Sequence, residues 1–387
     1  MGLKISGRSK ISPFIVMDVM RSANTREATG VDVLHLEVGQ PSTPAPKPVI
    51  KAANLALDGH LLGYTDALGI PMLKQHLAQY YKTYYDITIP GDRIVVTTGS
   101  SGAFLLSFLS VFEAGDKVGI TSPSYPAYKN ILRALGIEVI EIPVGADTSF
   151  KLNTEILDNI EVDLDGLIIA SPSNPTGTML SDSSLKEICN WCSTQKVRLV
   201  SDEIYHGITF KRKATSALSY SEDTIIINSF SKYFSMTGWR LGWMVVPDNL
   251  IRTIECLAQN FFISPPTLSQ LAAISIFDCF DELNANVDRY AQNRNILLTE
   301  LPKAGFEKIA PPEGAFYLYA DVSSITNDSE KFCAKILAET GVALTPGIDF
   351  DARYGKKFVR FSYAGATADI VEASKRLQKS YSNVSRQ

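Results

Sequence analysis

The sequence predicts an α/β fold in which a mainly parallel seven-stranded sheet lies between helices, followed by a smaller α+β unit. Two observations predict this class. Seven short apolar runs, rich in β-branched residues, alternate with helical segments between residues 93 and 246. Beyond a long polar-rich helix that starts near residue 281, the order becomes strand, helix, strand, helix. We therefore expect a large domain at residues 45–285 and a small domain at residues 1–44 and 286–387.

The composition narrows the class of protein. The chain has 387 residues, a net charge of −4 and a pI near 5.7, which argues against a nucleic-acid partner. No stretch resembles a signal peptide or a membrane span. The five cysteines are scattered and do not form a disulfide or zinc pattern, so no metal site is predicted. We expect a cytoplasmic protein without a membrane partner.

The first strand of the large domain leads into a candidate anion site. A helix near residues 14–22 and further helices around Val49 and Leu73 precede it. The strand, at residues 93–98, passes into a turn of small residues, and a helix is expected from Phe104. This order leaves backbone N–H groups free to bind an anion, although a plain tight turn explains the segment equally well. The candidate contacts in the turn are Ser100, Ser101 and Gly102.

Polar groups follow four of the next strands. The strands are expected at residues 117–121, 137–142, 166–170, 197–201, 224–228 and 241–246. Because ligands of open α/β sheets bind beyond the carboxyl ends of the strands, residues at these exits should open onto one crevice. The residues that follow the exits are Tyr125, Asn174, Asp202 with Tyr205, and Ser229 with Ser231 and Lys232.

Lys232 is the centre of the predicted chemistry. A lysine among apolar neighbours loses solvation, so its pKa falls and its amine becomes a nucleophile. Ser229, Ser231 and Arg240 lie close by in the sequence and could bind a phosphate. A Schiff-base lysine beside such groups suggests pyridoxal phosphate (PLP), the phosphorylated aldehyde cofactor. A surface lysine after a strand is the plainer alternative.

PLP chemistry assigns roles to the remaining candidates. Asp202 would keep the pyridine nitrogen protonated, while Tyr205 and Asn174 would tune the imine and Tyr125 would stack on the ring. Arg360 stands alone in an apolar strand at residues 357–362, where an unpaired guanidinium would be costly, so it is expected to bind the substrate's α-carboxylate. Read singly, each residue could equally be structural.

Four segments together resemble the class I/II aminotransferases of PLP fold type I: residues 171–177, 202–205, 229–232 and 238–242. The resemblance implies a homodimer with sites at the subunit interface, where Tyr64 reaches the neighbour's phosphate and Gly39 lies by the substrate carboxylate. It also implies a Lys232 aldimine and ping-pong transfer of an amino group from an α-amino acid to a 2-oxo acid, usually 2-oxoglutarate.

One departure from the family bears on the substrate. Aspartate-selective members often carry a lysine where this chain has Ser101, so a strict aspartate preference is not expected. Aromatic residues such as Phe14, Phe261 and Phe262 leave room for a neutral or aromatic amino acid. A carbon–sulfur β-lyase on the same scaffold is an alternative, and release of pyruvate and ammonia would distinguish it. A PLP-binding regulatory protein is less expected, since the N-terminal part has no room for a DNA-binding domain.

Overall fold

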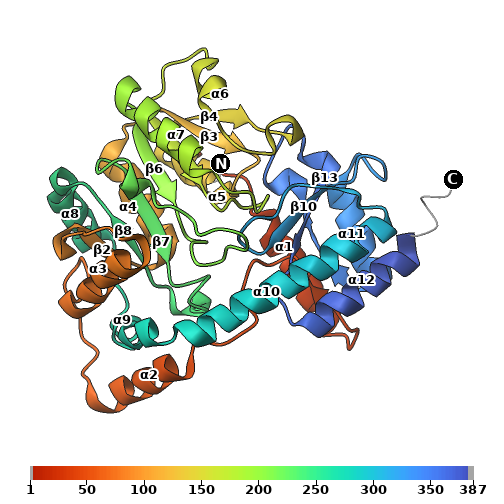
Figure 1. Cartoon of the computed structure of the whole chain (residues 1–387), viewed down its shortest axis with the longest axis horizontal. Coiled ribbons are helices and arrows are strands. Elements are labelled where there is room, and N and C mark those ends of the chain that lie inside the picture. Colours follow the sequence, from red (N-terminus) through yellow and green to blue (C-terminus); the bar gives the residue numbers. More distant parts are fainter. Residues whose placement is uncertain (1–2, 382–387) are drawn as a thin grey trace.

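A seven-stranded sheet forms the centre of the larger part of the molecule (Figure 1). The structure, a computed structural model, describes residues 3–381. Strand β8 is antiparallel to both of its neighbours, and the other pairs are parallel, so the predicted, mainly parallel sheet is confirmed. In spatial order the strands are β2 (Ile94–Thr97), β8 (Gly242–Val245), β7 (Ile225–Ser229), β6 (Arg198–Asp202), β5 (Gly166–Ala170), β3 (Lys117–Ser122) and β4 (Glu138–Pro143).

Several strands of the large sheet are buried on both faces, which explains their continuous apolar sequences. All residues of β2, β7 and β8 are buried, and the Trp243 ring is fully enclosed. Burying apolar area on both faces of a parallel sheet requires a helical layer on each side. The helices of this part are α2 (Lys47–Gly59), α3 (Pro71–Tyr85), α4 (Gly99–Val111), α5 (Pro126–Leu135), α6 (Thr154–Asp158), α7 (Asp182–Gln195), α8 (Ile251–Phe261) and α9 (Thr267–Ala273).

A second, antiparallel sheet lies in the C-terminal part, and the long helix α10 (Phe280–Glu300) leads to it from α9 (Figure 1). Its strand order is β12 (Thr345–Pro346), β13 (Phe358–Ser362), β10 (Tyr317–Asp321) and β9 (Lys308–Ile309). Helices α11 (Ser329–Thr340) and α12 (Thr367–Tyr381) complete this part.

The N-terminal segment packs with this C-terminal part. After α1 (Ile15–Glu27), strand β1 (Leu34–His35) pairs in parallel with β11 (Val342–Ala343). The N–H of Ser362 also donates to the carbonyl of Leu36 at 2.7 Å. Both ends of the chain therefore meet in the smaller unit.

Helix α4 begins earlier than the sequence predicts. It starts at Gly99, so Ser100, Ser101 and Gly102 form its first turn and do not precede it. Gly99 has a φ of +69°, which glycine tolerates, and the chain passes from β2 into the helix with a single intervening residue. The amides of a first helical turn lack intrahelical acceptors, so the predicted anion site keeps its free donors.

None of the helices in residues 3–381 combines the length and the apolarity needed to cross a lipid bilayer. The five cysteines, all within this range, are free thiols.

Candidate active site

A cavity of about 550 Å³ lies at the carboxyl ends of β5, β6 and β7, between the two parts of the chain. It brings together eleven of the residues singled out in the sequence: Gly39, Ser100, Ser101, Tyr125, Asn174, Asp202, Tyr205, Ser231, Lys232, Arg240 and Arg360. The expectation that the strand exits open onto one crevice is therefore met in the geometry.

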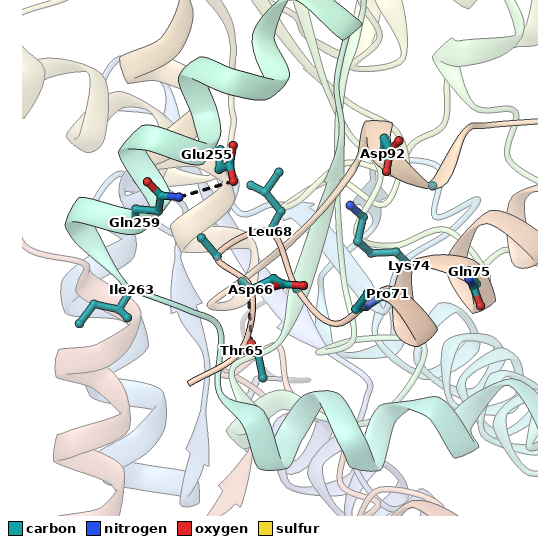
Figure 2. A pocket seen from close by; sticks show the side chains of 13 residues that line it. Thr65, Asp66, Leu68, Pro71, Lys74, Gln75, Asp92, Glu255, Gln259 and Ile263 are labelled. Atoms are coloured by element: carbon teal, nitrogen blue, oxygen red, sulfur yellow. Dashed lines mark hydrogen bonds between the residues drawn. The ribbon is translucent and has the colours of Figure 1, made fainter. Parts of the chain in front are cut away.

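A second and larger cavity, of about 750 Å³, lies elsewhere and contains none of these residues (Figure 2). Asp66, Lys74 and Asp92 line it, together with Glu255 and Gln259, which are joined by a long hydrogen bond of 3.5 Å. No group of three or more potential metal ligands occurs in the described residues. Volume alone therefore does not identify the functional site, and the smaller cavity is the candidate.

Lys232 lies half-buried in the cavity wall. Its Nζ donates to the carbonyl of Gly39 at 2.6 Å and lies 5.9 Å from the centre of the Tyr205 ring. Burial, and then the nearby Arg360 and Arg240 guanidinium groups, lower the pKa of Lys232 to about 8. A sizeable fraction of the amine is therefore neutral near physiological pH, as a nucleophile requires.

Asp202 is buried at the end of β6, facing the same cavity. Its Oδ2 accepts a very short hydrogen bond from the Tyr128 hydroxyl, and its Oδ1 accepts from the N–H of Ile204 at 3.1 Å. Burial raises the pKa of Asp202 to about 6, against the lowering effect of these hydrogen bonds and of Lys232. A cation placed against this carboxylate would relieve the desolvation, and a protonated ring nitrogen is such a cation.

A buried layer behind Asp202 ties two strand-end loops together. His206 Nε2 lies 2.9 Å from the carbonyl of Ser171 and must donate to it, so Nδ1 accepts from the Tyr85 hydroxyl at 2.7 Å. Burial lowers the pKa of His206 to about 4, which keeps the ring neutral, and burial raises the pKa of the adjacent Glu203 to about 8. This layer supports the loop that carries Asn174.

Arg360, in β13, is 2% exposed and turned toward the cavity. Its Nη1 donates to Asn174 Oδ1 at 2.8 Å, while its Nε has no hydrogen-bond partner in the described part of the chain. The guanidinium carbon lies 4.3 Å from the centre of the Tyr317 ring and 4.7 Å from that of Phe350. The two rings hold the planar Arg360 guanidinium in place, and its remaining N–H groups can donate to a carboxylate.

Another part of the cavity lining suits a phosphate. Ser100 and Ser101, at the start of α4, line it together with Arg240 and Thr237. A Cβ on Gly99 would lie 2.8 Å from Arg240 Nη2, so glycine makes room for the guanidinium beside the helix terminus. Helix N–H groups, the helix dipole and an arginine here offer a positive environment.

Three predicted cofactor contacts lie outside the lining. Ser229 Oγ bonds to Ser231 Oγ at 2.9 Å and supports it from behind. Gly102 is buried, and a Cβ there would lie 3.7 Å from the Phe262 ring. Tyr64 is 83% exposed on the outer surface. In the single chain, these residues support the site or stand apart from it.

Several lining residues were not assigned a role from the sequence. Tyr317 bonds to the Tyr205 hydroxyl at 2.7 Å, and a Cβ on Gly39 would lie 1.7 Å from the Tyr317 oxygen. Tyr317 comes from β10 in the other sheet, so no local pattern indicates it. The Tyr128 contact could have been found, because Tyr128 follows Tyr125 by one helical turn.

Helix α1 contributes an apolar wall to the cavity. Of the residues in and just before this helix, the sequence pointed only to Phe14. Phe14 packs edge-on against Tyr125, with ring centres 5.7 Å apart. Val16, Met17 and Met20 line the same side of the cavity. The spacing of these residues places them on one face of the helix.

The charged groups of the cavity fit PLP, and different groups suit different parts of the cofactor. Of the described residues that line the cavity, three are basic (Lys232, Arg240 and Arg360) and one, Asp202, is acidic. The buried amine suits the aldehyde, the buried carboxylate suits the ring nitrogen, and the two arginines suit a phosphate and a carboxylate. Fold and site together define a PLP-dependent enzyme of fold type I.

The chain belongs to the family described as aminotransferase class I and II, whose model matches residues 31–377. It is 48% identical to valine–pyruvate aminotransferase of Mycobacterium tuberculosis over 97% of both chains. It is 36% identical to (5-formylfuran-3-yl)methyl phosphate transaminase of Methanocaldococcus jannaschii, over 95% of this chain and 96% of that protein.

Solved structures agree with this assignment. The crystal structure of an aminotransferase from Mycobacterium tuberculosis matches with a TM-score of 0.96 at 48% identity, covering 98% of this chain and 99% of that one. Thermus thermophilus aspartate aminotransferase with maleate matches with a TM-score of 0.92 at 28% identity, covering 98% and 100%. The chain is therefore an aminotransferase, and its cofactor is PLP.

Proposed function

We propose that this aminotransferase moves the amino group of an apolar α-amino acid to a 2-oxo acid by a ping-pong mechanism. The observation that carries the proposal is the division of the cavity. Arg360, beside Asn174 and Tyr317, offers a carboxylate fork, and Arg240, beside Thr237 and Gly99, offers an anion site; Lys232 and Asp202 line the same cavity. The wall formed by α1 supplies apolar contacts for the substrate's side chain.

Each residue of the site has a distinct proposed task. When bound, PLP supplies an aldehyde that exchanges amino groups and a ring that withdraws electrons from the substrate's α-carbon. Lys232 Nζ holds the cofactor covalently between turnovers and moves the proton at the α-carbon. Asp202 keeps the proton on the ring nitrogen, and Arg360 orients the substrate through its α-carboxylate.

Polar and aromatic side chains of the cavity would set the electron distribution of the cofactor ring. Burial raises the pKa of Tyr205 well above its usual value, so this hydroxyl stays protonated and can donate to the ring oxygen. Asn174 is held by Arg360, which leaves its amide as a second donor. Tyr125 lies on the cavity wall with its ring available for stacking.

The number of basic residues in the cavity bears on which substrates it accepts. The family resemblance makes 2-oxoglutarate the expected acceptor, but its second carboxylate would need a cation beyond Lys232, Arg240 and Arg360. No further basic residue lines the cavity among the described residues. This favours pyruvate as a second candidate acceptor, and the similarity to a valine–pyruvate aminotransferase supports valine as donor.

A spectroscopic half-reaction screen tests the proposal. Each amino acid is added alone to the PLP form, and conversion to the amine form is followed by absorbance. We expect valine and other apolar amino acids to convert the enzyme fastest, and a 2-oxo acid to restore it. Failure of every α-amino acid, or release of ammonia with no 2-oxo acid present, would contradict the proposal.

The rate of PLP uptake by the apoenzyme should rise about tenfold per pH unit up to about pH 8 and then level off. The pKa of Lys232 is lowered to about 8, first by burial and then by Arg360 and Arg240, so below this pH the reactive neutral amine is the minor form. Asp202, with a pKa raised to about 6 by burial, should add a further loss below that pH. Stopped-flow absorbance between pH 5 and pH 10 measures the profile.

The Arg360→Gln variant tests whether the pH profile reports the titration of Lys232. Removing a positive charge near Lys232 should raise the pKa of its amine, so the midpoint should move to higher pH. A midpoint that stays in place would show that the profile belongs to another group.

We further propose a homodimer in which exposed apolar residues of two neighbouring segments contact a second copy. Leu61 is 97% exposed and Tyr64 83% exposed, and Phe261 and Ile263 are also exposed. Hydrogen bonds join the two segments, from Thr267 to the carbonyl of Gly63 at 2.6 Å and from the N–H of Thr65 to Ser264. An exposed apolar surface of this kind indicates an interaction site, and it would let Tyr64 reach the neighbour's phosphate.

The double variant Leu61→Glu/Phe261→Glu should run as a monomer in light scattering, while the wild type has twice the chain mass of 42.4 kDa. Charges buried at an interface are costly, so association should weaken strongly. Val162→Glu, at an exposed apolar position in another part of the chain, is the control and should leave the mass unchanged. A wild-type monomer would contradict the proposal.

We also propose a division into two domains and a cytoplasmic location. The β1–β11 pairing and the separate second sheet support a small domain of residues 1–44 and 286–387 beside a large one at 45–285. The five free thiols are consistent with a reducing compartment such as the cytoplasm.

A further inference from the structure

The first turn of α1 is held by a carboxylate from the other end of the chain. The residue before the helix, Phe14, cannot cap it with its side chain. Asp349 takes this role: its Oδ1 accepts the N–H of Ile15 at 3.0 Å, and its Oδ2 accepts the N–H of Val16 at 3.1 Å. First-turn amides have no intrahelical acceptors, so the carboxylate satisfies two of them and lies at the positive end of the helix dipole.

Asp349 is itself held in place. It ends the short 3₁₀ turn Gly347–Asp349 and is 7% exposed. The N–H groups of Phe350 and Asp351 both donate to the carbonyl of Gly347, at 3.0 and 3.1 Å. A Cβ on Gly347 would lie 2.6 Å from the carbonyl oxygens of Gly355 and Phe358, so the turn is closely packed. The carboxylate is therefore a fixed anchor for α1.

The residue that follows this turn, Phe350, contacts two segments of the cavity wall. The Phe350 ring packs on Arg360, and the carbonyl of Phe350 accepts the N–H of Ser124 at 3.1 Å, one residue before Tyr125. Tyr125 in turn packs against Phe14. Asp349 therefore links the apolar wall to the groups that orient the amino acid.

Only the first half of α1 depends on this anchor. Further along the helix, Ala23 is fully buried against Val33, Leu337 and Ala343. The cavity-lining residues Val16, Met17 and Met20 lie in the first two turns. Loss of the anchor would loosen the wall and leave the rest of the helix docked.

We propose that Asp349 is a positioning residue that sets the preference for branched apolar side chains, by holding the first turn of α1 against the cavity. This inference rests on the proposed function, since it assumes that the α1 wall receives the substrate's side chain. A displaced wall would lose contacts with a valine side chain, whereas alanine hardly reaches it.

Asp349→Asn tests the role with two readouts. The amide replaces one acceptor oxygen with a donor, so one helix N–H loses its partner. We expect the KM for valine to rise about tenfold, with less than about a twofold change for alanine and unchanged cofactor absorbance. Hydrogen exchange of the amides at residues 15–20 should accelerate about tenfold, independently of activity.

Asp351→Asn is the matched control. This carboxylate lies in the same loop, is equally buried, and accepts from the N–H groups of Arg353 and Tyr354. It should leave both the valine-to-alanine ratio and the exchange of α1 as in the wild type. If Asp349→Asn is insoluble, Asp349→Glu, which displaces the charge by one methylene, carries the same two readouts.

The possible outcomes distinguish the anchoring of α1 by Asp349 from its effect on substrate preference. Unchanged hydrogen exchange at residues 15–20 in Asp349→Asn would contradict the proposal that Asp349 anchors α1. Faster exchange with an unchanged valine-to-alanine ratio overturns the specificity role. If the wild type converts no amino acid, the proposed function fails, and the exchange comparison still decides whether Asp349 holds the helix.

Discussion

Lys232→Ala will lose covalently held cofactor, and its transamination rate will fall by about 10⁴-fold or more. The change removes both tasks proposed for Nζ at once, the attachment of the cofactor aldehyde and the movement of the α-proton. After borohydride treatment, peptide mass spectrometry should show the cofactor mass on the Lys232 peptide of the wild type. The variant should show no such adduct, together with a loss of the bound visible absorbance.

Lys129→Ala is the control for this experiment, because Lys129 is also largely buried but forms an ion pair with Glu141, at 3.3 Å. It should keep the adduct and the activity. An adduct on another lysine of the wild type, or full activity in Lys232→Ala, would refute the assignment of the nucleophile.

Arg360→Ala will raise the KM for every α-amino acid by about 100-fold or more while cofactor binding persists. The guanidinium is the one basic group at its end of the cavity among the described lining residues, and the Tyr317 and Phe350 rings hold its plane. Its loss removes the charged two-point contact that we propose fixes the substrate's orientation. Half-reaction kinetics with valine and with isobutylamine, which lacks the carboxylate, measure the effect.

The wild type should prefer valine strongly, and the variant should treat the two amines nearly alike. Arg294→Ala is the matched control, since this guanidinium also lies over an aromatic ring, that of Phe210 at 4.3 Å, but outside the cavity. A preference for valine that survives in Arg360→Ala would place the carboxylate site elsewhere.

Much of the large sheet could be predicted because most of its strands are buried on both faces. Such strands need unbroken apolar runs, as in residues 225–227, and these are visible without any alignment. The direction of β8 could not be read, since an apolar run looks the same whether the strand is parallel or antiparallel. The start of α4 was missed because Ser100 and Gly102 are weak helix formers that tertiary packing holds in a helix.

The site could be predicted as far as it follows strand ends. Asp202 ends β6, and Lys232 and Asn174 lie in the loops that follow β7 and β5, so the general rule for α/β sheets brings them together. Contacts between distant segments give no such local signal. Tyr205 meets Tyr317 across 112 positions, and Asp349 meets Ile15 across 334, because the chain returns to the site from a second sheet.

The segment at residues 261–263 has a consequence for how the protein behaves on dilution. The Phe262 ring packs beside Gly102 in the first turn of α4, while Phe261 and Ile263 face outward. This short segment therefore lies between the first turn of α4 on its inner side and exposed apolar surface on its outer side. If the subunits of the proposed dimer separate at low concentration, the first turn of α4 loses its outer support, so the diluted enzyme should release PLP faster than the concentrated enzyme.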